Sequence, residues 1–276
     1  MASLANTLDY VGLAFAAAGV GALGGLGGAV LLVPALVLTG VNATAAAPLG
    51  LICVAAGSVA AGSQQLVERA VNHRIGIATE LAASTAAVIG AVVSGLVSES
   101  VLTLLLAITA LAAALVGARR SDLRNPPREE CQPGDIGERI GSLAGAYPVG
   151  GGIAPYTTRR LPLGLGLMGV AGLMAGTIGA SGGFIKTPAM SEIMHVPTKV
   201  AAATTTFTVG ITSATALVVF AIQGRINVSA SAAVILGSLA GGYVGARFQA
   251  RLSPIAVRRG LSMLLVAVAI ALVVRL

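Results

Sequence analysis

The stretch Gly24-Gly25-Leu26-Gly27-Gly28, followed by Pro34, lies inside a long apolar segment near the start of the chain. A related stretch, Gly179-Ala180-Ser181-Gly182-Gly183 followed by Pro188, lies in a second apolar segment past the middle. Glycine and proline both disfavour continuous helix. Because Ala, Val, Leu and Ile surround these runs, they predict helices that are interrupted at membrane depth. Interrupted helices at corresponding positions of two halves are typical of transporter binding sites, where unwound backbone offers free N–H and C=O groups.

The composition is that of a protein with several membrane-spanning helices. The 276 residues are 56% hydrophobic and 10% charged, whereas soluble proteins carry roughly 25% charged residues. The net charge of +7 does not indicate a nucleic-acid partner, because the arginines fall in loops between apolar segments. The preference for positive loops on the cytoplasmic side explains them better. The residues before position 10 lack the basic region of a cleavable signal peptide, so we expect the first apolar segment to be retained.

Eight apolar segments fall into two groups of four. They cover residues 10–38, 43–67, 75–97 and 100–118, and then 161–191, 198–222, 226–250 and 256–274. The stretch 119–160 between the groups is rich in arginine, which predicts a cytoplasmic location. Its prolines and glycines predict a loosely ordered linker. The chain therefore divides into a first membrane repeat (1–118), a cytoplasmic linker (119–160) and a second membrane repeat (161–276).

The positions of the basic residues predict that the two repeats are inverted. If every segment crossed the membrane once, the linker and the basic cluster between Arg247 and Arg259 would lie on opposite sides, against the positive-inside rule. If 10–38 and 161–191 each enter and return, both basic regions are cytoplasmic and both termini lie outside. The expected fold is all-α, with two inverted repeats that each consist of a glycine-broken helical hairpin and three transmembrane helices. A single kinked span remains the alternative for each broken segment.

Polar residues near the two breaks form the candidate binding site. Lys186 lies three residues past Gly183, and a lysine at the bilayer centre costs about 3 kcal/mol. It either pairs with an anion or extends to the headgroups. Nearby hydroxyls either bind solute oxygens or bond to their own helix. The predicted substrate-binding residues are Gly24, Gly25, Gly27, Gly28, Gly179, Ser181, Gly182, Gly183, Lys186, Thr187, Thr204, Thr205 and Thr208.

Other residue types argue against catalysis and proton relay. Glu80, Glu99 and Glu192 all lie near predicted segment ends, so the sequence predicts no intramembrane carboxylate relay. Neither a zinc-ligand cluster nor a nucleophile with a base is present, so we expect no enzyme activity, metal or cofactor. Cys53 and Cys131 have no metal or redox spacing and are expected to be unreactive thiols.

Two further glycine pairs predict close helix packing rather than ligand binding. Gly172 and Gly176 form one pair and Gly241 and Gly245 the other, each with three residues between them. This spacing places both glycines on one helix face and allows a neighbouring backbone to approach.

The two breaks resemble the TauE/SafE sulfite-exporter family of membrane permeases, also called the 4-toluene sulfonate uptake permease family. Residues 27–34 and 181–188 carry the resemblance, supported by the Ala- and Thr-rich run at 201–206 and the Gly-Arg-Ile-Asn turn at 224–227. The resemblance covers nearly the whole chain. It implies a multi-pass permease of a bacterial-type cytoplasmic (inner) membrane for small sulfur-containing anions. The halves are not equivalent, since Leu32 stands in the first copy where Lys186 stands in the second.

The residues and the resemblance together predict export of sulfite or an organosulfonate by alternating access. An anion channel lined by the same residues is one alternative. A non-transporting membrane scaffold that acts through the linker is another. The expected partners are a small anion and the lipid bilayer, and a homodimer is one option for assembly. The exact substrate, the direction of flow and a coupling ion are left open by the sequence.

Overall fold

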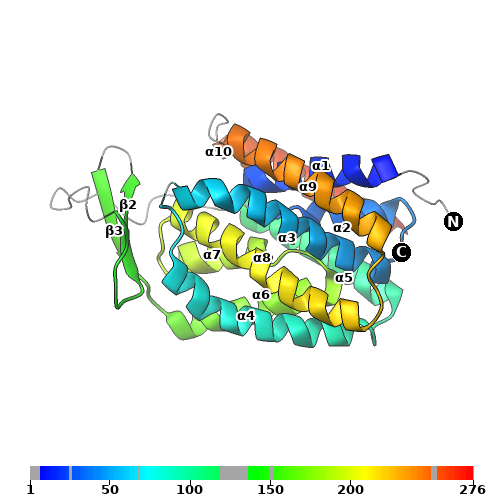
Figure 1. The fold of residues 1–276 in the computed structure, drawn as a ribbon, viewed down its shortest axis with the longest axis horizontal. Coiled ribbons are helices and arrows are strands. Elements are labelled where there is room, and N and C mark those ends of the chain that lie inside the picture. Colours follow the sequence, from blue (N-terminus) through cyan, green and yellow to red (C-terminus); the bar gives the residue numbers. More distant parts are fainter. Residues whose placement is uncertain are drawn as a thin grey trace.

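The computed structural model describes residues 7–24, 27–67, 69–118, 136–149, 152–249 and 254–275. Helices dominate this part of the chain (Figure 1). The helices are α1 (Thr7–Gly24), α2 (Ala29–Leu38), α3 (Ala43–Val67), α4 (His73–Ser94), α5 (Glu99–Ala118), α6 (Leu161–Ile178), α7 (Gly183–Pro188), the π-helix η2 (Ala189–Ile193), α8 (Thr198–Ile222), α9 (Val228–Gln249) and α10 (Pro254–Arg275). Among the described residues, α3, α4, α6, α8 and α9 are long and apolar enough to cross a membrane. The chain is therefore an all-α protein in its membrane part, as the composition predicts.

Both predicted helix breaks are present. Between α1 and α2, Gly27 has a φ of +78°, a left-handed backbone conformation that side chains rarely adopt. Between α6 and α7, Gly179 has a φ of +69° and ends α6. Each new helix then starts from a glycine carbonyl, because Leu32 N donates to Gly28 O and Lys186 N donates to Gly182 O, both at 2.9 Å.

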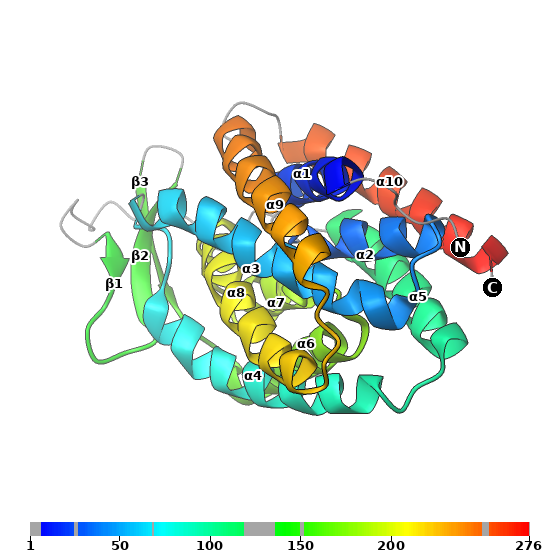
Figure 2. The ribbon, with the colours of Figure 1, turned by 45° about the vertical axis from the view of Figure 1, so that its right-hand side comes forward.

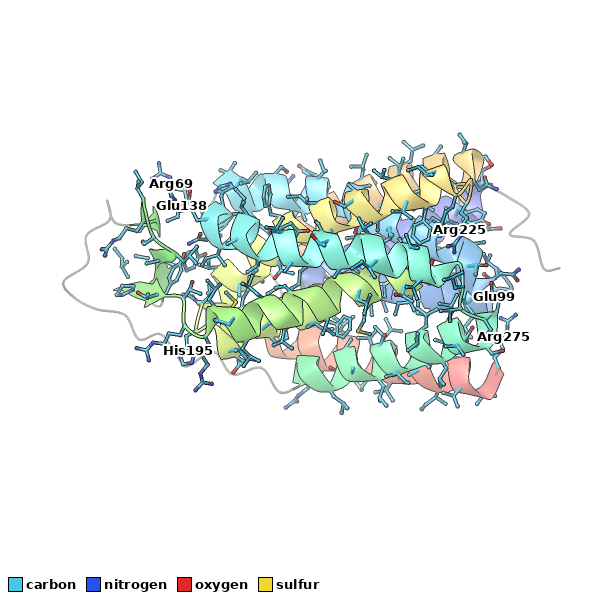
Figure 3. The ribbon with its side chains drawn as sticks, turned by 90° about the horizontal axis from the view of Figure 1, so that it is seen from below. Arg69, Glu99, Glu138, His195, Arg225 and Arg275 are labelled. Atoms are coloured by element: carbon cyan, nitrogen blue, oxygen red, sulfur yellow. The ribbon has the colours of Figure 1, made fainter. Side chains whose placement is uncertain are left out.

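Each broken segment starts and finishes at the same end of the molecule. Arg159 N, just before α6, donates to Met194 O, just after η2, at 3.0 Å, so the second broken segment doubles back. Arg275 donates to the carbonyls of Val37 and Leu38 at the end of α2. That end of the molecule also holds the start of α1 (Figures 1 and 2). Figure 3 places His195 and Arg275 at opposite ends. The two broken segments therefore enter the helical body from opposite ends.

The long helices pack closely where glycines remove side chains. A Cβ on Gly241 of α9 would lie 2.1 Å from the carbonyl oxygen of Phe15 in α1, and a Cβ on Gly172 of α6 would lie 1.9 Å from the carbonyl oxygen of Ala83 in α4. The packing role predicted for both glycine pairs is confirmed. Helix α3 lies beside α9, and α8 lies beside α4. Figure 2 shows α1, α9 and α10 gathered on one side of the molecule and α4, α6 and α8 on the other.

Part of the linker folds, so the prediction of a loosely ordered linker is wrong for this part. Strands β1 (Gly137–Glu138), β2 (Ala144–Val149) and β3 (Gly152–Thr157) form an antiparallel sheet in the order β1-β2-β3. The side chains of Tyr147 and Tyr156 are buried in a cluster with Met194 at the adjoining helix ends. Burial of these aromatic side chains attaches the sheet to the helical body and supplies the free energy to order it. Residues 119–135 lie outside the described part.

Candidate functional site

The two helix breaks meet inside the helical body. A Cβ on Gly27 would lie 2.3 Å from Ser181 Oγ, so the first break contacts the second directly. A Cβ on Gly50 of α3 would lie 2.6 Å from Gly179 O, and one on Gly179 would lie 2.3 Å from the Ala47 backbone. Such separations are shorter than carbon contacts allow, and only glycine fits these positions without movement. Gly24 is the last residue of α1, and Gly25 lies outside the described residues.

A small pocket lies beside the first break. It has a volume of about 30 Å³, and its lining includes Gly27, Gly28, Cys53, Gly57, Ser58 and Thr206. This volume is enough for a water molecule but too small for a sulfur oxyanion. In the conformation described, this pocket is therefore too small for such a solute. Four of these lining residues, Cys53, Gly57, Ser58 and Thr206, are not among the predicted binding residues.

The second break is fully enclosed by protein. Ser181 is 1% exposed, and its Oγ accepts a hydrogen bond from Gly183 N at 3.2 Å. Gly182 packs against α6, since a Cβ there would lie 2.7 Å from Ala171 O. The hydroxyl of Thr187 is buried and has no hydrogen-bond partner in the described part of the chain. Buried polar atoms are almost always paired, so this hydroxyl is an exception in the described part of the chain.

Lys186 pairs with a carboxylate inside the protein and does not reach the headgroups. It is 1% exposed, and its Nζ lies 2.7 Å from Oε2 of Glu80 in α4. Lys186 Nζ also donates to Thr212 Oγ1 of α8 at 2.6 Å. The prediction that Glu80 lies near a segment end is wrong. Helix α4 begins at His73, which places Glu80 two turns inside it, 5% exposed, and covered by α8.

The three predicted threonines of α8 are buried but do not line the pocket. Thr204 Oγ1 accepts a hydrogen bond from Asn72 N at 3.0 Å, at the start of α4. Thr205 contacts the sulfur of Met190 at 3.8 Å, and Thr208 donates to the carbonyl oxygen of Thr205 at 3.2 Å. The predicted residues thus occupy the crossing of the breaks, the ion pair and the start of α8. Their role in substrate binding stays a prediction.

A polar network closes the end of the molecule that carries Glu99 and Arg225 (Figure 3). The Glu99 carboxylate accepts hydrogen bonds from Ala43 N at 2.7 Å and Thr44 N at 3.2 Å, which caps α3. Arg225 donates to Ser94 Oγ at 2.7 Å and to Thr44 O at 2.6 Å. Partial burial lowers the pKa of Arg225, and the negative charge of Glu99 opposes this shift. The network ties the starts of α3 and α5 to the loop between α8 and α9.

A second network joins the sheet to the opposite end. Asn72 Oδ1 accepts from Ile75 N at 3.0 Å and caps α4, while its Nδ2 donates to Tyr156 Oη at 3.0 Å. His73 Nδ1 lies 3.8 Å from a Glu138 carboxylate oxygen. Burial raises the pKa of Tyr156; the hydrogen bond from Asn72 lowers it, and the charge of Glu138 adds to the rise.

Comparison with known proteins identifies the family. A model of the family described as Sulfite exporter TauE/SafE matches residues 10–272. The chain belongs to the TauE/SafE family. A relative in Bacillus subtilis (strain 168), described as probable membrane transporter protein YunE, is 34% identical over 93 residues, which are 33% of this chain and 34% of that protein. The chain thus aligns with about a third of that relative's length. No solved structure matches the chain.

Membership of the TauE/SafE family confirms the resemblance inferred from the glycine breaks. Together with the helices that are long and apolar enough to cross a membrane, it indicates a multi-pass membrane protein. The family is described as one of sulfite exporters.

Proposed function

We propose that this TauE/SafE protein exports a small sulfur-containing anion, sulfite or an organosulfonate, by alternating access across a bacterial-type inner membrane. The single observation that carries the proposal is the contact between Gly27 and Ser181, which brings the two helix breaks together inside the helical body. Breaks that face each other supply main-chain N–H donors from two directions, and such donors stabilise an anion where water is excluded.

The proposed architecture is a pair of inverted repeats, 1–118 and 161–276, joined by a cytoplasmic linker at 119–160. Two observations support it. The broken segments enter from opposite ends, and the packing of α1 along α9 is repeated by the packing of α6 along α4. Each of these helix pairs combines one helix from each half. Movement of one half relative to the other would therefore slide both contacts together and change access to the crossing.

The pocket beside the first break is the proposed path by which the anion reaches the crossing. It is too small for the anion in this conformation, so a conformational change must widen it. Gly57 lies on the pocket wall and leaves room for a methyl group, because a Cβ there would lie 3.8 Å from Ala18 Cβ. A longer side chain would fill the pocket without first displacing backbone.

Flux through the purified protein in liposomes tests the proposal. We expect saturable uptake of labelled sulfite, with competition among sulfoacetate, taurine, thiosulfate, methanesulfonate, sulfate and simple carboxylates identifying the substrate. Gly57→Leu should lower flux at least ~10-fold by blocking the pocket, and the matched Gly57→Ala should retain wild-type flux. Single-channel currents that do not saturate would indicate a channel. If no anion is transported, the transport role is contradicted and the scaffold alternative is favoured.

Mass photometry of the purified protein in detergent tests whether it forms a homodimer.

A further inference from the structure

A buried ion pair connects the segment after the second break to two neighbouring helices. Lys186 of α7 and Glu80 of α4 are 2.7 Å apart and are almost completely buried. Thr212 of α8 accepts from Lys186 and donates to Glu80 Oε1. Ser84 donates to the same carboxylate oxygen at 2.7 Å. Two opposite charges thus neutralise each other inside the membrane part of the protein.

The first half of the chain shows that the fold does not need charges here. The two glycine-and-proline motifs align Leu32 with Lys186, and Leu32 is fully buried. The alignment that matches Gly90 with Gly241 matches Glu80 with Ser231. Apolar residues of similar volume often replace a buried ion pair without loss of stability. Ionisable side chains inside membrane segments mark ion and proton pathways, and such a role explains why one half holds a pair.

Apart from its lysine partner, no ionisable side chain faces Glu80 from the elements that pack around it in the described part of the chain. Helix α6 contains none, and α8 contains only Lys199, which is exposed at its start. On α4 itself, His73 and Arg74 lie two turns away at the exposed start of the helix. Glu192 lies in η2, past the proline that ends α7. In the described part of the chain, Glu80 therefore supplies the negative charge that balances the ammonium group of Lys186.

We propose that Glu80 is a proton-binding site that decides whether Lys186 can bind the transported anion. The inference rests on the proposed function and adds the coupling ion. With Glu80 ionised, its carboxylate is the counter-ion of Lys186. When a proton adds to the carboxylate, Glu80 becomes neutral and the ammonium group loses its counter-ion. A monoanion then takes that place.

Charge neutrality sets the stoichiometry. The empty site holds one carboxylate and one ammonium group, and the loaded site holds a neutral carboxyl group, the ammonium group and the anion. Both states are neutral, so both can reorient without moving an unbalanced charge through the membrane, which is costly. One proton therefore accompanies each monoanion in the same direction. Net flow follows the sum of the two gradients, so it is outward only when the outward gradient of the anion exceeds the inward gradient of protons.

Transport driven separately by a pH gradient and by a membrane potential tests this coupling. The probe is methanesulfonate, whose charge does not change in the working pH range, or the strongest acid among the anions carried. At zero potential, we expect accumulation of about tenfold per pH unit, as one-to-one coupling requires. A potential alone should drive none. Accumulation that depends on the membrane potential but not on the pH gradient would overturn the proton coupling, while the proposed permease function would still stand. Absence of flux for every anion would overturn both.

Paired substitutions separate coupling from a structural role. In Glu80→Met with Lys186→Met, both charges are removed and side-chain volume is kept. We expect a folded protein, by gel filtration and thermal unfolding, with anion flux reduced at least ~10-fold. Wild-type flux with wild-type pH dependence in this variant would overturn the inference.

Glu80→Gln mimics the protonated state of the carboxyl group, so anion flux through this variant should respond to the membrane potential and not to pH. Thr85→Val, at an exposed position of α4 where the hydroxyl donates to Leu81 O of its own helix at 2.8 Å, is the control with unchanged coupling.

Discussion

At the residue scale, the role of a buried polar side chain in the candidate site depends on the partner that it contacts. Lys186 alone signals either an anion partner or a route to the headgroups. Its 2.7 Å contact with Glu80 excludes the second interpretation, in which the side chain extends to the lipid headgroups. The sequence places these two residues more than a hundred positions apart, and the packing of both α7 and α4 against α8 brings them together. Glu80 was missed because the boundary of its segment was set too close to it.

Tyr156 is a residue whose ionisation should affect stability at alkaline pH. Burial raises its pKa above the usual value of 10.0, so the folded state holds the phenol proton more tightly than the unfolded state. Its contribution is fully present below pH 10.0 and is lost as pH rises through the folded-state pKa. We expect the melting temperature of the wild type to fall more steeply above that pH than that of Tyr156→Phe.

The same substitution should also weaken the protein at neutral pH. In Tyr156→Phe, Asn72 Nδ2 loses its acceptor, at a cost of about 1–3 kcal/mol. Thermal unfolding in detergent across a pH series measures both effects. Parallel pH profiles for wild type and variant would show that the phenol does not titrate with unfolding.

At the element scale, the interrupted helices and the close helix contacts depend on two different properties of glycine: its backbone freedom in the first case and its lack of a side chain in the second. Gly27 and Gly179 adopt positive φ and end or begin helices. Gly172 and Gly241 keep helical geometry and admit a neighbouring backbone. The sequence distinguishes the two uses by spacing, since near-contiguous glycines followed by proline break a helix while pairs four apart form a packing face. Both readings agree with the observed elements.

Helix α6 offers a matched pair of glycines that tests the packing contact. Gly172→Ala should destabilise the protein by about 1–3 kcal/mol, because its Cβ would lie 1.9 Å from Ala83 O in α4 and force the helices apart. On the same helix, a Cβ built on Gly169 would have no described atom within 4 Å apart from its chain neighbours and the backbone of its own helix. Gly169→Ala should therefore leave stability unchanged or raise it by up to about 1 kcal/mol. Thermal unfolding of both variants makes the measurement, and equal melting temperatures would contradict the contact.

At the scale of the whole molecule, two polar networks mark opposite ends. One holds Glu99 and Arg225, and the other holds the sheet with Glu138 (Figure 3). The predicted topology places the first outside the cell and the second in the cytoplasm. The structure separates the two ends but contains no membrane, so the orientation stays a prediction.

Labelling of single cysteines in intact cells tests this orientation. In a variant with Cys53→Ala and Cys131→Ser, Ser100→Cys should react with a membrane-impermeant maleimide in intact cells, because it is exposed beside Glu99. Ile140→Cys, at a side chain that is 88% exposed beside the sheet, should react only after the cells are opened. The reverse labelling pattern would show that the topology is opposite to the predicted one. Reaction of both residues in intact cells would contradict the assignment of the two ends to opposite sides.

The membrane class, the two breaks and the packing glycines could be predicted from the residues alone, because hydrophobicity, backbone freedom and helical spacing are local properties of the chain. The folded sheet in the linker was not foreseen, since its order depends on burying Tyr147 and Tyr156 against distant helix ends. Only the tertiary structure decided that the breaks touch at Gly27 and Ser181, and that Glu80 neutralises Lys186. Contacts between elements far apart in the chain follow from how helices pack, and no local pattern encodes that.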